Sequence, residues 1–267
     1  MKSLKPFLFI IIIFIAGVFL TLPVVSVPLQ YLDFEYIVGD DDTITILRYT
    51  GDIESLTVPS EIDGKKVTTI GRGAFGSNEN LTSIKIPDSI TIIGSSAFAY
   101  NTNLKEIILS VSLKEMQGYA FRECKSLQSI IIPEGVTCIG NYTFADCESL
   151  TIVTLPSTIE SIGEFAFQFC TSLTAINFPE GLIGIDYGAF LFCNSLKEIT
   201  IQSTIENIPS FAFSNCSDLL KISILSPNVK IEKDAFRKCG LAIIYAHDGS
   251  TGAAYAKANK MPLIILK

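Results

Sequence analysis

The chain has 267 residues, of which 48% are hydrophobic and 18% are charged, and its 27 acidic and 20 basic side chains give a formal net charge of −7. This length and apolar content exclude a disordered tail. The acidic balance argues against a nucleic-acid partner, because phosphate binding depends on clustered Lys and Arg. Seven Cys and a single His leave little scope for metal chemistry, so we expect neither a metal site nor a cofactor.

Residues 1–28 have the pattern of an export segment. Lys2 and Lys5 precede an unbroken apolar run from Phe7 to Leu20, and a basic start before about 7–15 apolar residues is typical of a secretory signal peptide. The best small residue for cleavage is Ser26, which makes a poor site, so the run could also stay as a signal anchor, since about 20 apolar residues span a bilayer. A buried core helix is the third alternative. Both export hypotheses place the rest of the chain outside the cytoplasm.

Residues 29–70 are predicted to form an N-terminal cap and a degenerate first repeat. The segment "TITILRYTGDIESLTVP" alternates apolar and polar residues, which indicates short strands with one buried face. The charge run Asp40–Asp42 could hold Ca²⁺, but a solvated turn is the better interpretation.

Residues 71–240 contain one unit that recurs with a 23-residue period. Each unit has Phe preceded by Ala (Thr143 is the exception). In every unit except the last, Leu follows six residues later and apolar residues follow nine, eleven and eighteen residues later. The recurring aromatic residues are Phe75, Phe98, Phe121, Phe144, Phe167, Phe190, Phe213 and Phe236. Such a fixed period indicates a stacked array of one supersecondary unit.

The alternating positions nine and eleven residues after each Phe predict a short strand with one buried face, as in "LTSIKIP" and "LQSIIIP",. The strand is often closed by Pro, which has no N–H for a ladder. Because one such strand cannot bury its apolar face alone, the copies must stack into a parallel ladder about 4.8 Å apart. We therefore predict a repeat solenoid, mostly β with short turns, that carries a parallel sheet on one face.

Residues 241–267 are predicted to form a C-terminal cap, because a solenoid must cover its last apolar face. The repeat spacing slips by about one residue after Cys239. Residues 253–259 form a helix candidate and residues 262–266 a closing strand. The single histidine, His247, stands next to Asp248 and near Ser250, but neighbours in sequence do not make a catalytic triad. We interpret His247 as a surface loop residue.

The unit "IGxxAFxxCxxLxxIxIPxxV", as in "SIGEFAFQFCTSLTAINFPEGL", resembles the BspA-like, treponemal-type leucine-rich repeat. The segments "YTGDIESLTVPSEIDGKKVTTIGRGAF" and "GSTGAAYAKANKMPLIIL" are similar to the usual beginning and end of that family. The resemblance covers residues 36–267 and implies a right-handed leucine-rich-repeat coil. Members are typically surface or secreted proteins, several of them adhesins, so it implies binding rather than catalysis. It supplies no site residues, because the motif is structural.

Six cysteines occupy one register of the repeat, three residues after Phe. They are Cys124, Cys147, Cys170, Cys193, Cys216 and Cys239. Neighbouring copies would bring their Cα atoms about 5 Å apart, within the range of a disulfide. Asn78 and Asn101 occupy the same register in earlier copies, however, and parallel side chains fit the disulfide torsion poorly. We therefore favour buried thiols that donate to backbone carbonyl groups, and we expect Cys138, outside the register, to be a core thiol.

The outward side chains of the strands are the natural binding surface. Isoleucines fill outward positions on three neighbouring strands, and an exposed apolar strip often marks a contact surface; β-branched filler in a parallel sheet is the alternative. The candidate binding residues are Ile108, Ser129, Ile131, Ile152, Thr154 and Asn177.

The predicted function is that of an exported, non-enzymatic module that binds a protein or glycan at the cell surface. One alternative is a glycan-acting enzyme of the parallel β-helix type, which needs paired carboxylates. Glu134 and Glu180 share a register but lie two copies apart, about 10 Å by strand spacing, so they do not form such a pair. The other alternative is a structural surface-layer module without a ligand. No catalytic residue is predicted.

Overall fold

The computed structural model describes residues 13–15, 18–20 and 28–267. Most of the predicted export segment, residues 1–28, lies outside the described residues. Within them, β1 (Ile13–Ile15) and β2 (Val18–Leu20) pair antiparallel. Among the described helices, none has the length and apolar character needed to cross a bilayer.

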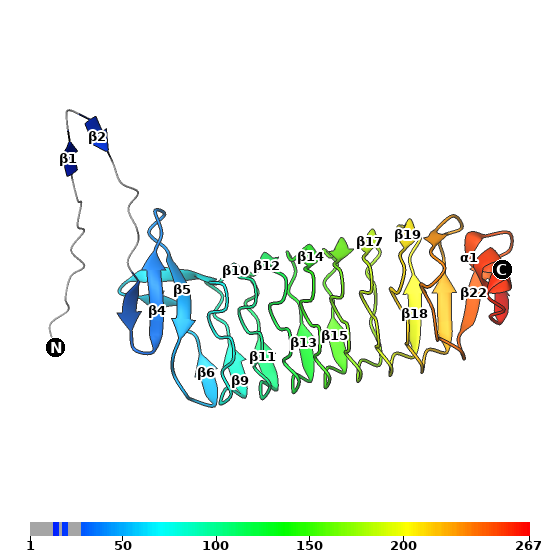
Figure 1. The fold of residues 1–267 in the computed structure, drawn as a ribbon, viewed down its shortest axis with the longest axis horizontal. Helices are drawn as coiled ribbons and strands as arrows, with labels where there is room; N and C mark the ends of the chain where they lie inside the picture. Colours follow the sequence, from blue (N-terminus) through cyan, green and yellow to red (C-terminus); the bar gives the residue numbers. More distant parts are fainter. Residues whose placement is uncertain (1–12, 16–17, 21–27) are drawn as a thin grey trace.

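The described chain forms an elongated solenoid in which successive coils lie side by side along one axis (Figure 1). Most coils carry one strand on the sheet face and one shorter strand on a second face, and most neighbouring strands of the same kind pair in parallel at the predicted 23-residue offset, as between Glu106 and Ser83. This confirms the predicted repeat solenoid. The sheet-face strands of the repeats are β9 (Ser83–Lys85), β11 (Glu106–Ile108), β13 (Ser129–Ile131), β15 (Ile152–Thr154), β18 (Glu198–Ile201) and β20 (Lys221–Ile224).

The second face consists of two-residue strands that begin just before the inward isoleucine of each coil. They pair in parallel in three separate groups, and the first group continues from the last strand of the N-terminal cap. These strands are β10 (Ile92–Ile93), β12 (Glu115–Met116), β14 (Cys138–Ile139), β16 (Ser161–Ile162), β17 (Gly184–Ile185), β19 (Asn207–Ile208) and β21 (Lys230–Ile231).

The N-terminal cap is an antiparallel meander that joins the parallel second face. Strands β3 (Leu29–Tyr31), β4 (Phe34–Val38) and β5 (Ile44–Tyr49) pair antiparallel, and β5 then pairs in parallel with β8 (Lys65–Ile70). Strand β6 (Ser55–Thr57) opens the sheet face by pairing with β9, with Ser55 opposite Ser83. The sequence distance from Ser55 to Ser83 is longer than the repeat period. The additional residues lie in the hairpin formed by β7 (Glu61–Ile62) and β8.

The centre of the solenoid is a continuous column of phenylalanine rings. From Phe75 to Phe236 the successive ring centroids lie 5.1–5.5 Å apart, and the rings of Phe98 and Phe121 are almost parallel, with 2° between their planes. The rings from Phe75 to Phe213 are fully buried, and most of the inward Leu and Ile side chains are buried around them. Each coil therefore packs mainly on its two neighbours, as expected of a solenoid.

Tight turns flank the buried ring of each coil. Tyr119 and Glu123, two residues before and after Phe121, have φ angles of 63° and 58°. The same pair of left-handed positions recurs around every column phenylalanine from Phe75 to Phe213. These turns fold the backbone closely around the ring, and most of them use residues other than glycine.

One coil departs from the predicted pattern. Residues 175–177 were expected to form a sheet-face strand, but they make only isolated bridges, from Ala175 to Ile152 and Glu198. The next inward residue, Phe178, stands where the other coils carry Ile or Leu, and its ring packs against Phe190 and Phe213 at 5.6 and 6.3 Å. We attribute the interrupted ladder to this larger side chain.

The C-terminal cap closes the solenoid with two strands and a short helix. Strand β22 (Ile243–His247) pairs with β20 at an offset slightly shorter than the repeat period, with Ile243 opposite Lys221, which is the slip that the sequence indicates. Helix α1 (Thr251–Ala258) begins at Ser250, whose hydroxyl accepts a hydrogen bond from the Ala253 N–H. Strand β23 (Leu263–Leu266) forms the last strand of the sheet face.

The cysteine register forms a ladder of buried free thiols. Each Sγ donates to the carbonyl oxygen of the phenylalanine 26 residues earlier, as from Cys124 to Phe98 at 3.1 Å. All seven cysteines are free, which agrees with the favoured interpretation. The prediction that Cys138 is a core thiol is wrong, because this side chain is exposed. Cys138 directly precedes the inward Ile139 in β14 and therefore points to the opposite side,.

Candidate functional site

The sheet face presents two parallel columns of outward side chains. One column contains Ser83, Glu106, Ser129, Ile152, Ala175, Glu198 and Lys221, and the other contains Lys85, Ile108, Ile131, Thr154, Asn177, Thr200 and Ser223. All of these side chains are exposed or partly exposed except Ser223, which is buried beside the larger Tyr245 of β22. The regular repeat therefore places a flat surface of selected side chains on one side of the molecule.

Three isoleucines form an exposed apolar group, which we call the isoleucine patch, consisting of Ile108, Ile131 and Ile152. Their side chains are 50%, 70% and 57% exposed. Ile108 and Ile131 are neighbours in one column, on the adjacent strands β11 and β13. Ile152 lies in the other column, where it pairs with Ser129. The predicted strip is thus a diagonal step rather than a straight line.

The other predicted binding residues divide between this patch and the next coil. Ser129 lies opposite Ile152, and Thr154 lies opposite Ile131, so both border the isoleucine patch. Asn177 lies outside this group, in the coil where the ladder is interrupted. The structure therefore brings five of the six predicted residues together and places Asn177 beside a different feature.

That feature, which we call the polar hollow, is lined by Asn177, Phe178, Glu198, Thr200, Gln202 and Lys221 together with Ile176 and Ile199, and it has a volume of about 250 Å³. The hollow was not predicted as a site from the sequence. Its polar residues could be recognised as outward positions, but the depression that they line together with Phe178 could not.

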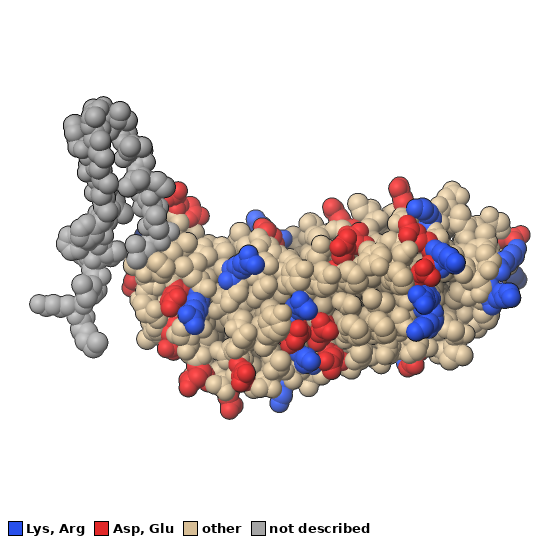
Figure 2. Space-filling model, in the orientation of Figure 1, with Lys and Arg blue, Asp and Glu red and all other residues tan. Residues whose placement is uncertain are grey.

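Charged side chains border this face without forming a field of one sign. The ammonium group of Lys221 lies 3.9 Å from the carboxylate of Glu198, and Lys197 pairs with Asp218 at 2.6 Å. Figure 2 shows acidic and basic side chains in small mixed groups, separated by uncharged surface. The charges on the face shown in Figure 2 are therefore of mixed sign.

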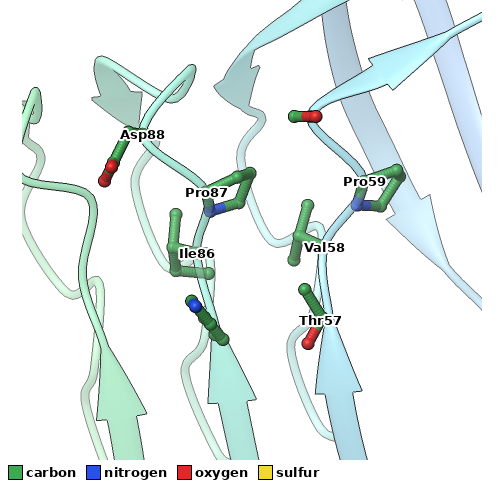
Figure 3. A pocket seen from close by; sticks show the side chains of 8 residues that line it. Thr57, Val58, Pro59, Ile86, Pro87 and Asp88 are labelled. Carbon is green, nitrogen blue, oxygen red and sulfur yellow. The ribbon is translucent and has the colours of Figure 1, made fainter.

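A larger depression lies near the N-terminal end, at the point where the first two sheet-face strands end. Figure 3 shows Pro59 and Pro87 side by side on successive coils, with Val58 and Ile86 below them. The depression has a volume of about 470 Å³. The carboxylate of Asp88 there accepts a hydrogen bond from the Val111 N–H. We regard this depression as a consequence of the Pro turns rather than a site.

A second aromatic column lies on another side of the coils, and it was not predicted from the sequence. Successive ring centroids lie 4.9–5.5 Å apart, and four of the five residues have left-handed backbone angles. Its members are Tyr119, Tyr142, Phe165, Tyr187 and Phe211. The first three rings stack face to face. Mainly their edges are therefore left to contact a partner.

Comparison with known proteins identifies the repeat. The family model described as a BspA type leucine rich repeat region matches residues 46–154 and 137–253 with six copies. The chain belongs to the BspA-type leucine-rich-repeat family. It is also 32% identical to the Treponema pallidum leucine-rich-repeat protein TpLRR, over 72% of this chain and 90% of that one, with a TM-score of 0.67.

Two more distant structures share the fold. A leucine-rich cell surface protein of Faecalibacterium prausnitzii is 22% identical over 90% of this chain and 94% of that one, with a TM-score of 0.54. The pneumococcal vaccine antigen PcpA is 17% identical over 91% of this chain and 99% of that one, with a TM-score of 0.50. No curated protein matches the sequence at a significant level. The match to the family model confirms the resemblance that the sequence indicates.

In this BspA-type repeat the cysteines of the register form hydrogen bonds to backbone carbonyl groups. Burial raises the pKa of the Cys124 thiol to about 12, so the thiol stays protonated and donates its hydrogen at neutral pH. Thiolates are the reactive form of cysteine, which makes the Cys124 thiol a poor nucleophile. Within residues 28–267, His247 is exposed, and the described part of the chain has no cluster of His, Cys, Asp and Glu suited to a metal ion.

Proposed function

We propose that this BspA-type leucine-rich-repeat protein is exported and acts as a non-enzymatic binding module at the cell surface, with its sheet face as the contact surface for a protein or glycan. The observation that carries the proposal is the isoleucine patch. Large apolar side chains that lie together and remain 50–70% exposed are typical of contact surfaces. The basic and apolar pattern of residues 1–28 supports export,.

The rigidity of the sheet face suits recognition through many weak contacts. Its strands are held by parallel pairing with neighbouring strands, β9 with β11 and β13 with β15, and by the buried core beneath them. A surface that is already formed loses little conformational entropy when it binds. Burial of the three isoleucines by a partner would add hydrophobic stabilisation of roughly 25 cal/mol per Å² of apolar area.

The proposal can be tested with the full chain, expressed and exported by a bacterial host. Binding to a panel of extracellular-matrix proteins and cell-surface glycans would be measured for the wild type, Ile131→Glu and Ile152→Glu. Ile183→Glu is the matched control, because Ile183 is 59% exposed but lies outside both outward columns of the sheet face. We expect the first two variants to lose at least tenfold in affinity and the control to bind like the wild type.

Other outcomes would contradict the proposal in different ways. Unchanged binding by both glutamate variants would show that the isoleucine patch is not the contact surface. A wild type inert toward the whole panel would favour a structural module without a ligand. Turnover of a glycan by the purified chain would favour the enzyme hypothesis.

A further inference from the structure

The polar hollow differs from the rest of the sheet face because its polar groups keep unused hydrogen-bonding capacity. Within the described chain, the Asn177 amide and the Thr200 hydroxyl make no side-chain hydrogen bond. The Gln202 Nε2 donates to the Phe178 carbonyl oxygen at 3.2 Å, which leaves the Gln202 carbonyl oxygen as a further acceptor. The hollow thus offers both donors and acceptors to a molecule that enters it.

The charges in the hollow compensate each other. Glu198 and Lys221 are directly opposite on β18 and β20, and their charged atoms are 3.9 Å apart. This separation is too long for a hydrogen bond, so the Glu198 carboxylate keeps its capacity to accept hydrogen bonds. The Lys221 ammonium also lies 5.6 Å from the centre of the Tyr245 ring. An anion would meet the Glu198 carboxylate and a cation the Lys221 ammonium, so the local charge favours an uncharged ligand.

One side of the hollow is continuous with apolar surface. The column that reaches Glu198 passes through Ile152 and Ala175, which are joined by single bridges. A ligand seated on Asn177 and Thr200 would therefore extend over Ala175 toward the isoleucine patch. A molecule with hydroxyl groups along its edge and C–H groups on its face fits this arrangement of polar and apolar surface.

We infer that the polar hollow is the subsite for one ring of a neutral saccharide, recognised through hydroxyl groups by Asn177, Glu198, Thr200 and Gln202. Sugar hydroxyls both donate and accept hydrogen bonds, which matches this mixture of amide, carboxylate and hydroxyl groups. The volume of about 250 Å³ lies below the roughly 300–1,000 Å³ of pockets for drug-sized ligands, which suits a single ring. The inference rests on the proposed function and specifies the class of its glycan partner.

The test is a binding experiment with the full chain on an array that carries neutral, sialylated and sulfated oligosaccharides. We expect neutral oligosaccharides to bind. In solution titrations with a bound neutral oligosaccharide, Asn177→Ala should lower the affinity about five- to tenfold, as expected for the loss of one or two hydrogen bonds. Glu160→Gln is the control for the charge-removing variant Glu198→Gln described next, because Glu160 is exposed on another part of the solenoid.

Glu198→Gln tests the charge argument separately. This variant leaves Lys221 without its acidic partner, so binding of sulfated oligosaccharides should rise while binding of neutral ones falls. All of these side chains lie on the surface, and thermal unfolding curves that match the wild type would show that the variants are folded.

The negative outcomes separate the two proposals. Binding of only sialylated or sulfated oligosaccharides, or unchanged affinity of Asn177→Ala, would overturn the saccharide subsite. Loss of binding in Ile131→Glu together with full binding in Asn177→Ala would also overturn it, while supporting the isoleucine patch. Binding of matrix proteins without binding of any oligosaccharide would leave the proposed function standing and contradict this inference.

Discussion

Asn101 and Cys124 donate to the same acceptor, the carbonyl oxygen of Phe98. The Asn101 Nδ2 lies 2.8 Å from this oxygen and the Cys124 Sγ lies 3.1 Å from it. Asn101 also donates to Phe75 at 2.8 Å and accepts the Asn78 N–H. Asparagine and cysteine therefore serve the same function in successive coils, because each supplies a buried donor to a backbone carbonyl of the preceding coil.

This relationship predicts the effect of changing Asn101. Asn101→Ala leaves buried backbone groups of Phe75 and Asn78 without their partner, and it should lower the free energy of unfolding by about 2–3 kcal/mol. Asn101→Cys should recover part of that loss, because the thiol can donate to Phe75 as Cys124 does to Phe98. Denaturant unfolding with circular dichroism would measure both changes.

A matched control for Asn101 exists in the same turn. Asn103 is exposed, and its amide donates to the Glu79 carbonyl oxygen at 2.7 Å. Asn103→Ala should cost less than about 1 kcal/mol, because water replaces the lost hydrogen bond. Equal losses at Asn101 and Asn103 would show that the register does not depend on a buried donor.

Thiol labelling should separate Cys138 from the ladder. Cys138 is exposed, whereas the six ladder cysteines are buried. An aromatic disulfide reagent at neutral pH should therefore modify one thiol quickly in the folded protein and all seven after denaturation. Cys138→Ser should remove the fast phase, and fast labelling that persists in this variant would contradict a buried ladder.

Alkaline pH should weaken the fold through the buried Cys124 thiol. Burial raises the pKa of Cys124 from 9.0 to about 12, so the folded state keeps a proton that the unfolded state has lost above pH 9. Stability from this group is therefore complete below about pH 9 and is lost as the pH rises toward 12. Over that range one such group lowers the free energy of unfolding by about 1.4 kcal/mol per pH unit.

Cys124→Ala would isolate this contribution. The variant is less stable at neutral pH, but its free energy of unfolding should fall less steeply between pH 9 and pH 12 than that of the wild type. Parallel pH curves for the two proteins would show that Cys124 does not titrate as the structure predicts.

Phe178→Ile should restore the interrupted sheet. Isoleucine is the residue at the same position in other coils, such as Ile132 and Ile201, and it should let residues 175–177 pair with β18. We expect slower hydrogen exchange of the amides in this segment, together with partial closure of the polar hollow. Unchanged exchange would show that the large ring is not the cause of the interruption.

The constant period of the repeat was enough to predict the solenoid, the buried phenylalanine column and the thiol ladder, because each depends on which residues share a register. The repeat also identified the outward positions of the isoleucine patch. The backbone interruption at Phe178 was not predicted, because both phenylalanine and isoleucine satisfy an apolar register. The exposed position of Cys138 could have been derived from its place beside Ile139, since adjacent residues of a strand point to opposite sides.

The polar hollow and the aromatic column could not be read from the register in the same way. The hollow depends on how side chains from three successive coils are arranged around Phe178. The column depends on left-handed turns at Tyr119, Tyr142 and Phe165, a conformation that aromatic residues rarely adopt. Both features arise from three-dimensional geometry that a pattern of apolar positions does not encode.

The coil-to-coil packing of the core also makes the length of this protein adjustable. Because each coil contacts mainly its neighbours, the insertion or deletion of one whole coil could preserve every type of contact around the join. Each such change would move the C-terminal cap relative to the isoleucine patch by about 4.8 Å, the spacing of one strand. The chain can thus vary its reach in fixed increments while the chemistry of each surface stays the same.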